Sequence, residues 1–120
     1  MQGSVVRPDP DQEFMTPERC AILESWNDDS DGAVSIARAR VDPGVTTRLH
    51  RLNVDERYIF LEGRGVARVG ELKAAEVHPG DVVLIPAGTP QQITNRGDSP
   101  LVFYCICSPR FDPAGYEALE

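Results

Sequence analysis

The chain has 120 residues, with 12 Lys and Arg against 19 Asp and Glu, and a formal net charge of −7 at pH 7. This length favours one domain with a single core, and the acidic balance, without a basic stripe, speaks against binding to nucleic acid or to an anionic membrane surface. No run approaches the ~20 apolar residues of a spanning helix and the start lacks an apolar leader, so we expect a cytoplasmic protein whose partners are small molecules or a second copy of itself.

The N-terminal residues 1–13 are polar and contain two prolines, which predicts an arm that is either loose or laid against a neighbour. We expect a single domain over residues 14–120. Its first strands are predicted at 19–26 and at 33–41, with an acidic turn between them. Arg38 and Arg40 share one face of the second strand, and that face either borders water or forms a wall that attracts anions.

The stretch from 44 to 63 contains two alternating apolar and polar runs, 45–52 and 56–61, around the polar tripeptide 53–55. This pattern predicts a β-hairpin. Since side chains two apart on a strand share a face, the first run places together Arg48, His50 and Leu52. From the second run, the side chains expected to face them are Glu56, Tyr58 and Phe60. A histidine and a carboxylate therefore meet across one hairpin.

The remaining chain alternates short strands with Gly/Pro turns. We predict strands at 64–69, 82–85, 91–95 and 101–107, of which 82–85 is buried on both sides and 101–107 is fully buried, and a short strand or loop at 71–77. His78 lies in a turn and is expected to be exposed. Asp112 and Pro113 supply a cap and a first-turn proline for a short helix reaching about Leu119. Strands at this spacing indicate an all-β barrel or sandwich.

Two segments of the chain match a pair of spaced motifs, written G(X)5HXH(X)3-4E(X)6G and G(X)5PXG(X)2H(X)3N. The residues that fit the first motif are Gly44, His50, Glu56 and Gly63. Those that fit the second are Gly80, Pro86, Gly88 and Asn95. In these positions the chain resembles the cupin superfamily. The resemblance implies a double-stranded β-helix of jelly-roll type, here with the short C-terminal helix.

The chain departs from both motifs at positions where metal-binding cupins have histidine ligands, because Leu52 and Gln91 stand there. Carried over position by position, the resemblance leaves His50, Glu56 and Gln91 to hold one divalent transition metal such as iron, manganese, zinc or nickel. Imidazole and carboxylate are good ligands for these ions, whereas an amide oxygen is neutral and weak. A metal held by this set is therefore expected to bind loosely.

The same residues also support a metal-free interpretation. Inside a barrel Glu56 is costly as an unpaired anion, and His50, Arg48 or Gln91 can pair with it to form a satisfied polar network. In this interpretation His50 and Glu56 exchange protons and Tyr58 assists. The residues expected to line a ligand pocket are Arg48, Leu52, Phe60 and Gln91, with Arg48 placed to receive an anionic group.

Three functions therefore remain open from the sequence. The first is a small metal-dependent enzyme of dioxygenase or isomerase type, and the second is a metal-free protein that binds a small molecule or acts on it by acid–base chemistry. The third is a non-catalytic dimeric module, since cupins commonly form homodimers. Cys105 and Cys107 are expected to be reduced, buried thiols, with a metal or redox role as the alternative, and Cys20 a reduced thiol at the surface or in the core.

Overall fold

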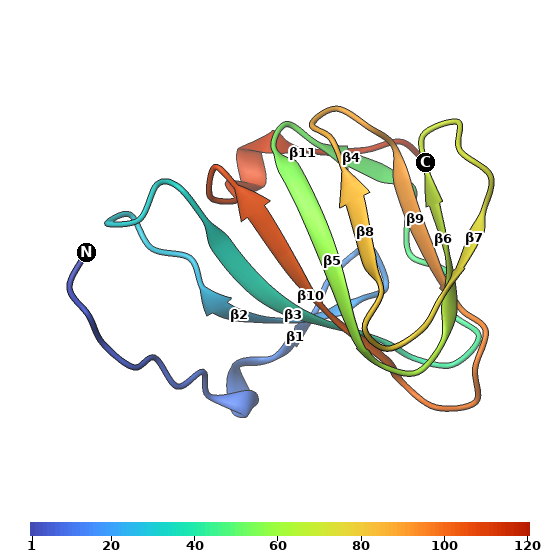
Figure 1. The fold of residues 1–120 in the computed structure, drawn as a ribbon, viewed down its shortest axis with the longest axis horizontal. Coiled ribbons are helices and arrows are strands. Elements are labelled where there is room, and N and C mark those ends of the chain that lie inside the picture. The colour runs from blue at the N-terminus through green and yellow to red at the C-terminus, as the bar shows by residue number, and fades with distance from the viewer.

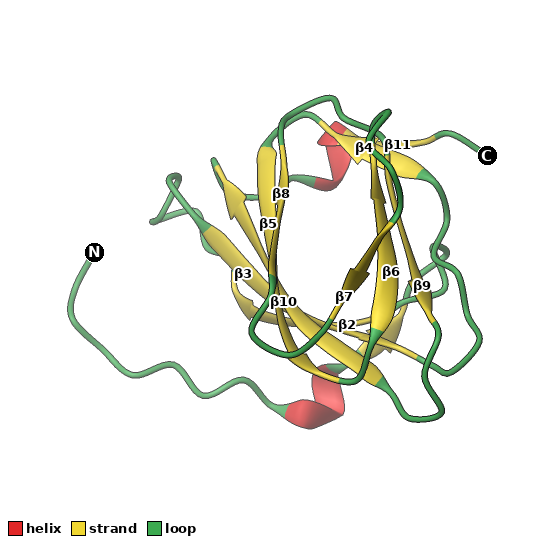
Figure 2. Cartoon of the chain, turned by 45° about the vertical axis from the view of Figure 1, so that its right-hand side comes forward, coloured by secondary structure: helices red, strands yellow, loops and turns green.

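In the computed structural model, which describes all 120 residues, the strands form two antiparallel sheets that face each other across a common interior (Figures 1 and 2). The larger sheet contains, in spatial order, β1 (Phe14–Met15), β2 (Ala21–Trp26), β3 (Ser35–Val41), β10 (Leu101–Ser108), β5 (Asp55–Glu62) and β8 (Val82–Ile85). The smaller contains β11 (Tyr116–Ala118), β4 (His50–Leu52), β9 (Gln91–Asn95), β6 (Gly65–Val69) and β7 (Ala75–Val77). The predicted all-β jelly-roll architecture is confirmed.

The predicted hairpin of the first motif is wrong, because its two strands belong to opposite sheets. β4 pairs with β9 and β11, whereas β5 pairs with β10 and β8. The alternation of apolar and polar residues indicates which side chains face the core. It does not indicate which strand pairs with which. His50 and Glu56 thus project into the interior from two different sheets, and both are buried.

Strand β8 is not buried on both sides as its apolar sequence suggested. It is the edge of the larger sheet, and its outward residues Val82 and Leu84 are 55% and 66% exposed. β10 lies in the middle of that sheet, but its residues Tyr104 to Ile106 are only half-buried. Apolar runs occur on exposed sheet faces as well as on covered ones. Composition alone therefore could not show whether β8 and β10 are buried or exposed.

The helix expected up to Leu119 is limited to one 3-10 turn, η2 (Pro113–Gly115), and the chain then continues as β11. Asp112 caps this turn by accepting a hydrogen bond from the Ala114 backbone N–H. Tyr116 lies opposite Leu52 and packs against the small buried cluster around that residue, which favours pairing with β4 over a continued helix. Neither of the two short 3-10 turns has the length or the apolar character of a membrane-spanning helix.

The N-terminal residues 1–9 extend away from the barrel without regular structure and are exposed (Figures 1 and 2). They lead into the 3-10 turn η1 (Pro10–Gln12) and then into Glu13, whose carboxylate pairs with Arg40 at 2.7 Å and lies 3.9 Å from Arg38. The two arginines are thus half-buried on the outside of β3 and do not line the interior. The division between arm and domain at residue 13 stays a prediction.

Two residues of the matched motifs close one end of the barrel, Gly63 between β5 and β6 and Asn95 at the end of β9. Gly63 has φ 82°, and a Cβ there would lie 2.6 Å from the Pro100 carbonyl oxygen, so only glycine fits. The buried Asn95 side chain donates to the carbonyls of Val41 and Ser99, each at 2.9 Å, and accepts from the Gly97 N–H at 2.8 Å. One amide thereby satisfies three backbone groups of this end.

Asn95→Ala is expected to lower the free energy of unfolding by about 3 kcal/mol, because it leaves buried backbone groups of Val41, Ser99 and Gly97 without partners. Urea denaturation measures the loss. The matched control is Gln92→Ala on the same strand, whose half-buried side chain makes no hydrogen bond and whose loss should cost less than about 0.5 kcal/mol. Equal losses in the two variants would contradict the role given to Asn95.

Candidate functional site

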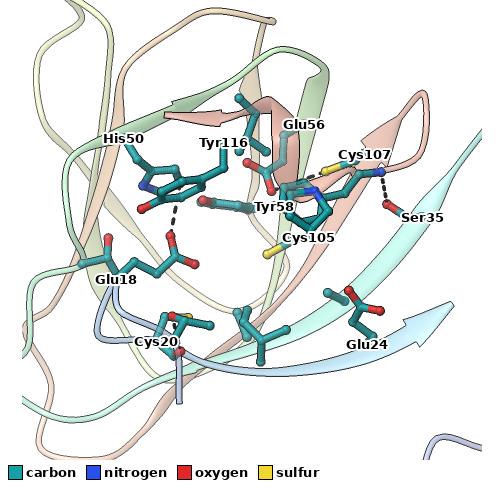
Figure 3. Close-up of a pocket in the computed structure, with 18 of the residues that line it drawn as sticks. Glu18, Cys20, Glu24, Ser35, His50, Glu56, Tyr58, Cys105, Cys107 and Tyr116 are labelled. Atoms are coloured by element: carbon teal, nitrogen blue, oxygen red, sulfur yellow. Dashed lines mark hydrogen bonds and ion pairs between the residues drawn. The ribbon is translucent and has the colours of Figure 1, made fainter. Parts of the chain in front are cut away.

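A cavity of about 410 Å³ occupies the barrel interior between the two sheets (Figure 3). Its walls are mainly apolar, and they include Ile22, Ala37, Ala39, Ile93, Phe103 and Phe111. Most polar groups gather in two places, one around Glu56 and one around His50, and the Glu24 carboxyl lies apart from both. An apolar chamber with a few converging polar groups is the usual form of a small-molecule site.

The structure brings most of the predicted site residues to this cavity. Those that line it are Arg48, His50, Leu52, Glu56 and Tyr58. Gln91 lies just behind the wall, only 1% exposed, and touches the cavity through its partners. Phe60 does not line the cavity, because it packs beneath Tyr58 and Phe103 in the apolar core. The prediction that Phe60 forms part of the pocket wall is therefore wrong.

Glu56, Gln91 and Tyr58 form a hydrogen-bonded chain at the base of the cavity. The Tyr58 hydroxyl donates to Gln91 Oε1, and Gln91 Nε2 donates to Glu56 Oε1 at 2.8 Å. The Cys107 thiol donates to Glu56 Oε2 at 3.6 Å. Both carboxyl oxygens of Glu56 and both polar atoms of Gln91 thus have partners within the protein.

Burial raises the pKa of Glu56 to about 7, mainly because the anion loses its hydration in this apolar setting. The hydrogen bonds from Gln91 and Cys107 favour the anion, while the charge of Glu18 disfavours it. The carboxyl therefore exchanges its proton near neutral pH. Burial also raises the pKa of Cys20 and Cys107 to about 12, so these free cysteines are thiols rather than thiolates.

His50 does not turn toward Glu56. Its Nδ1 lies 2.7 Å from the backbone carbonyl of Arg48, which only accepts, so Nδ1 carries the hydrogen. Its Nε2 lies 3.4 Å from Glu18 Oε2, and its ring stacks on Tyr116 with 5.0 Å between centroids. Figure 3 shows Glu18 and His50 pointing toward each other, with Tyr116 beside the imidazole.

Glu18 and Tyr116 are the two residues of this site that the sequence analysis missed. Glu18 sits in the turn between β1 and β2, and Tyr116 begins β11, so both lie outside the paired motifs. Burial raises the pKa of Glu18, whereas the neighbouring charges of His50 and Arg48 lower it. The only local signal near Glu18 was the Thr16-Pro17 pair, which predicts a turn. A predicted turn does not show where the Glu18 side chain points.

The arrangement does not fit the metal site that the resemblance implied. Leu52 has no donor atom, the oxygen of Gln91 accepts from Tyr58, and His50 Nε2 is directed at Glu18. No group of three or more His, Cys, Asp or Glu side chains is arranged to hold a metal ion. With one imidazole and one carboxylate in separate places, the set lacks the three or four convergent donors that transition metals need.

Comparison with known proteins agrees with the motif positions and the sheet topology. The family model described as the cupin domain matches residues 37–107, which is more than half of the chain. The chain belongs to the cupin family. The match ends before Tyr116 and begins after Glu18, so these two residues of the pocket belong to the flanking segments of this cupin.

Two curated relatives share sequence with this cupin. It is 39% identical to the uncharacterized protein MJ1618 of Methanocaldococcus jannaschii over 87 residues, covering 72% of this chain and 69% of that protein. It is 32% identical to the uncharacterized protein YrkC of Bacillus subtilis over 68 residues, covering 52% of this chain and 37% of that protein. The chain thus spans little more than a third of YrkC.

Solved structures share the fold. A predicted oxalate decarboxylase from Thermotoga maritima superposes with a TM-score of 0.77 at 23% identity, covering 88% of this chain and 99% of that one. A cupin 2 conserved barrel domain protein from Salinispora arenicola gives a TM-score of 0.75 at 22% identity, covering 94% and 92%. At these identities the likeness concerns the barrel architecture.

Glu56→Gln tests the raised pKa of Glu56. Because the folded-state pKa of about 7 exceeds the ordinary value of 4.5, the folded state holds this proton more tightly, and the resulting stability is complete below about pH 4.5 and lost as the pH rises through 7. The stability of the wild type relative to Glu56→Gln should therefore fall by up to about 3 kcal/mol across this interval. Urea denaturation at a series of pH values measures the difference, and a flat difference would contradict the raised pKa.

Proposed function

We propose that this cupin binds a small, neutral, mainly apolar molecule in its barrel cavity, and that it does so without a resident transition metal. The observation that carries the proposal is the cavity of about 410 Å³, whose walls are mostly apolar and where the motif positions Glu56 and Gln91 are already hydrogen-bonded to each other. A molecule that enters meets hydrocarbon on most sides, so the gain from burying its apolar surface drives binding.

The charges in the cavity support a neutral ligand. Three carboxyl side chains line the cavity, those of Glu18, Glu24 and Glu56, against one guanidinium, that of Arg48. Although the Thermotoga maritima neighbour is a predicted oxalate decarboxylase, a dianion such as oxalate would be placed here in a cavity lined by three carboxyl groups. Like charges in a poorly hydrated space repel strongly, which disfavours such a ligand in this chain.

Proton transfer is a second candidate function of the same cavity. Glu56 has a pKa of about 7, which suits a group that both accepts and donates a proton near neutral pH. Gln91 and Tyr58 hold its carboxyl in one orientation, so Glu56 is the exchanging group that we assign and Tyr58 supports it through Gln91. His50, which the sequence analysis paired with Glu56, serves the other polar centre in this proposal.

Filling the cavity tests the binding proposal. We expect at least one neutral aromatic or alicyclic compound at 1 mM to raise the melting temperature of the wild type by roughly 3–5 °C, as ligand linkage requires for a dissociation constant well below that concentration. Ala37→Phe places a ring in the cavity and should abolish the shift, whereas Ala33→Phe on the exposed turn before β3 should keep it. The same shift in both variants would refute binding in the cavity.

Restoring the missing histidines tests the absence of a resident metal. After soaking with Mn²⁺, Fe²⁺ or Zn²⁺ and gel filtration, the wild type should retain less than about a tenth of an equivalent, because its donors do not converge. The Leu52→His/Gln91→His double variant should retain close to one equivalent. Elemental analysis measures both, and a full equivalent in the wild type would overturn the metal-free proposal.

We also propose that the chain forms the homodimer common among cupins. The supporting observation is the group of exposed apolar side chains on β5 and β8, which are Leu61, Val82 and Leu84. Contiguous exposed apolar residues favour a protein interface. Sedimentation should show a dimer for the wild type and a monomer for Leu84→Glu, and a monomeric wild type would contradict this proposal.

A further inference from the structure

Two buried side-chain atoms have no hydrogen-bond partner in the protein, and both belong to residues that line the cavity. They are Oε2 of Glu18 and the hydroxyl of Tyr116. Arg48 lies near that hydroxyl, but no pair of their atoms has hydrogen-bond geometry. Native proteins rarely bury a polar atom without a partner, so two such atoms beside one cavity indicate a missing partner that comes from outside the chain.

The turn that carries Glu18 is tied down on several sides. Arg19 adopts φ 68°, an uncommon left-handed conformation for a residue with a side chain. Its guanidinium donates to the Thr46 carbonyl at 2.8 Å and to Glu120 Oε1 at 2.7 Å, and the Glu18 carbonyl accepts from the Arg48 N–H at 3.0 Å. The Glu18 carboxyl is therefore held toward the cavity despite the cost of its burial.

The His50 and Glu18 side chains together offer one donor and one acceptor. Because His50 Nδ1 gives its hydrogen to the Arg48 carbonyl, Nε2 carries either a lone pair or, when the ring is charged, a hydrogen. Burial favours the neutral form of Glu18, whose carboxyl then carries the proton; with that proton on His50 Nε2 instead, the two groups would exchange the roles of donor and acceptor. In each case one of the two atoms, Glu18 Oε2 or His50 Nε2, carries a proton and the other can accept it. They lie 3.4 Å apart, which is longer than an ordinary hydrogen bond.

We infer that the ligand carries a hydroxyl group, which bridges Glu18 Oε2 and His50 Nε2 while its apolar body fills the cavity. An oxygen at roughly 2.8 Å from each atom forms a triangle on their 3.4 Å separation. A hydroxyl both donates and accepts, so it matches the pair in either protonation arrangement. A methyl group can neither donate nor accept. A carboxylate can only accept, and its negative charge is disfavoured beside the carboxyl groups of the cavity. This inference rests on the proposed function and narrows its ligand to a neutral alcohol or phenol.

Matched naphthalenes test the inference on the wild type. We expect 2-naphthol to bind at least about tenfold more tightly than 2-methylnaphthalene, by titration calorimetry at pH 7, and 2-naphthoate to bind more weakly than either. Equal affinities for the first two compounds would overturn the hydroxyl bridge and leave cavity binding standing. Failure of all three to bind, together with a featureless thermal-shift panel, would instead remove the proposed function.

Glu18→Met separates a binding role from a structural one. It removes the unpartnered oxygen and keeps the side-chain length, so the melting temperature should stay within about 1 °C of the wild type or rise, while the preference for 2-naphthol over 2-methylnaphthalene should fall about tenfold. Glu71→Gln, an exposed residue in the turn after β6, is the control and should keep the preference. A Glu18→Met protein that melts earlier and retains the preference would assign Glu18 to the fold and refute the inference.

Discussion

The cavity depends on one amide that joins the two sheets. Gln91 belongs to β9 of the smaller sheet, and its side chain accepts from Tyr58 and donates to Glu56, both on β5 of the larger sheet. An amide has a donor and an acceptor side by side, so it can satisfy a hydroxyl and a carboxyl at the same time. These bonds hold the sheets at a fixed separation and keep the carboxyl buried at the base of the interior.

The two polar centres of the cavity differ in how far they are satisfied. Around Glu56 every polar atom has a partner inside the protein, which stabilises a buried network and rigidifies it. Around His50, Oε2 of Glu18 and the hydroxyl of Tyr116 remain without one. The first centre therefore contributes to the architecture and can exchange a proton, and the second is open to a molecule from outside.

This cupin keeps the turn-forming positions of its family's motifs and departs at positions with a chemical role. Gly63 and Asn95 close one end of the barrel. Leu52 and Gln91 change the donor set, and Glu18 brings a carboxyl to His50 from a segment outside the family match. A barrel whose strands carry the fold tolerates such exchanges at its interior, because the strand pairing does not depend on them.

The sequence by itself determined the all-β fold, the strand faces and the turns, because alternation and glycine or proline punctuation are local properties of the chain. It also placed His50 and Glu56 on the inward face. The tertiary structure alone decided that these two residues stand on opposite sheets, that the apolar strand β8 is an edge, and that Glu18 is the neighbour of His50. Glu18 and His50 are brought together by packing between segments far apart in the chain, and no local pattern records which segments will meet.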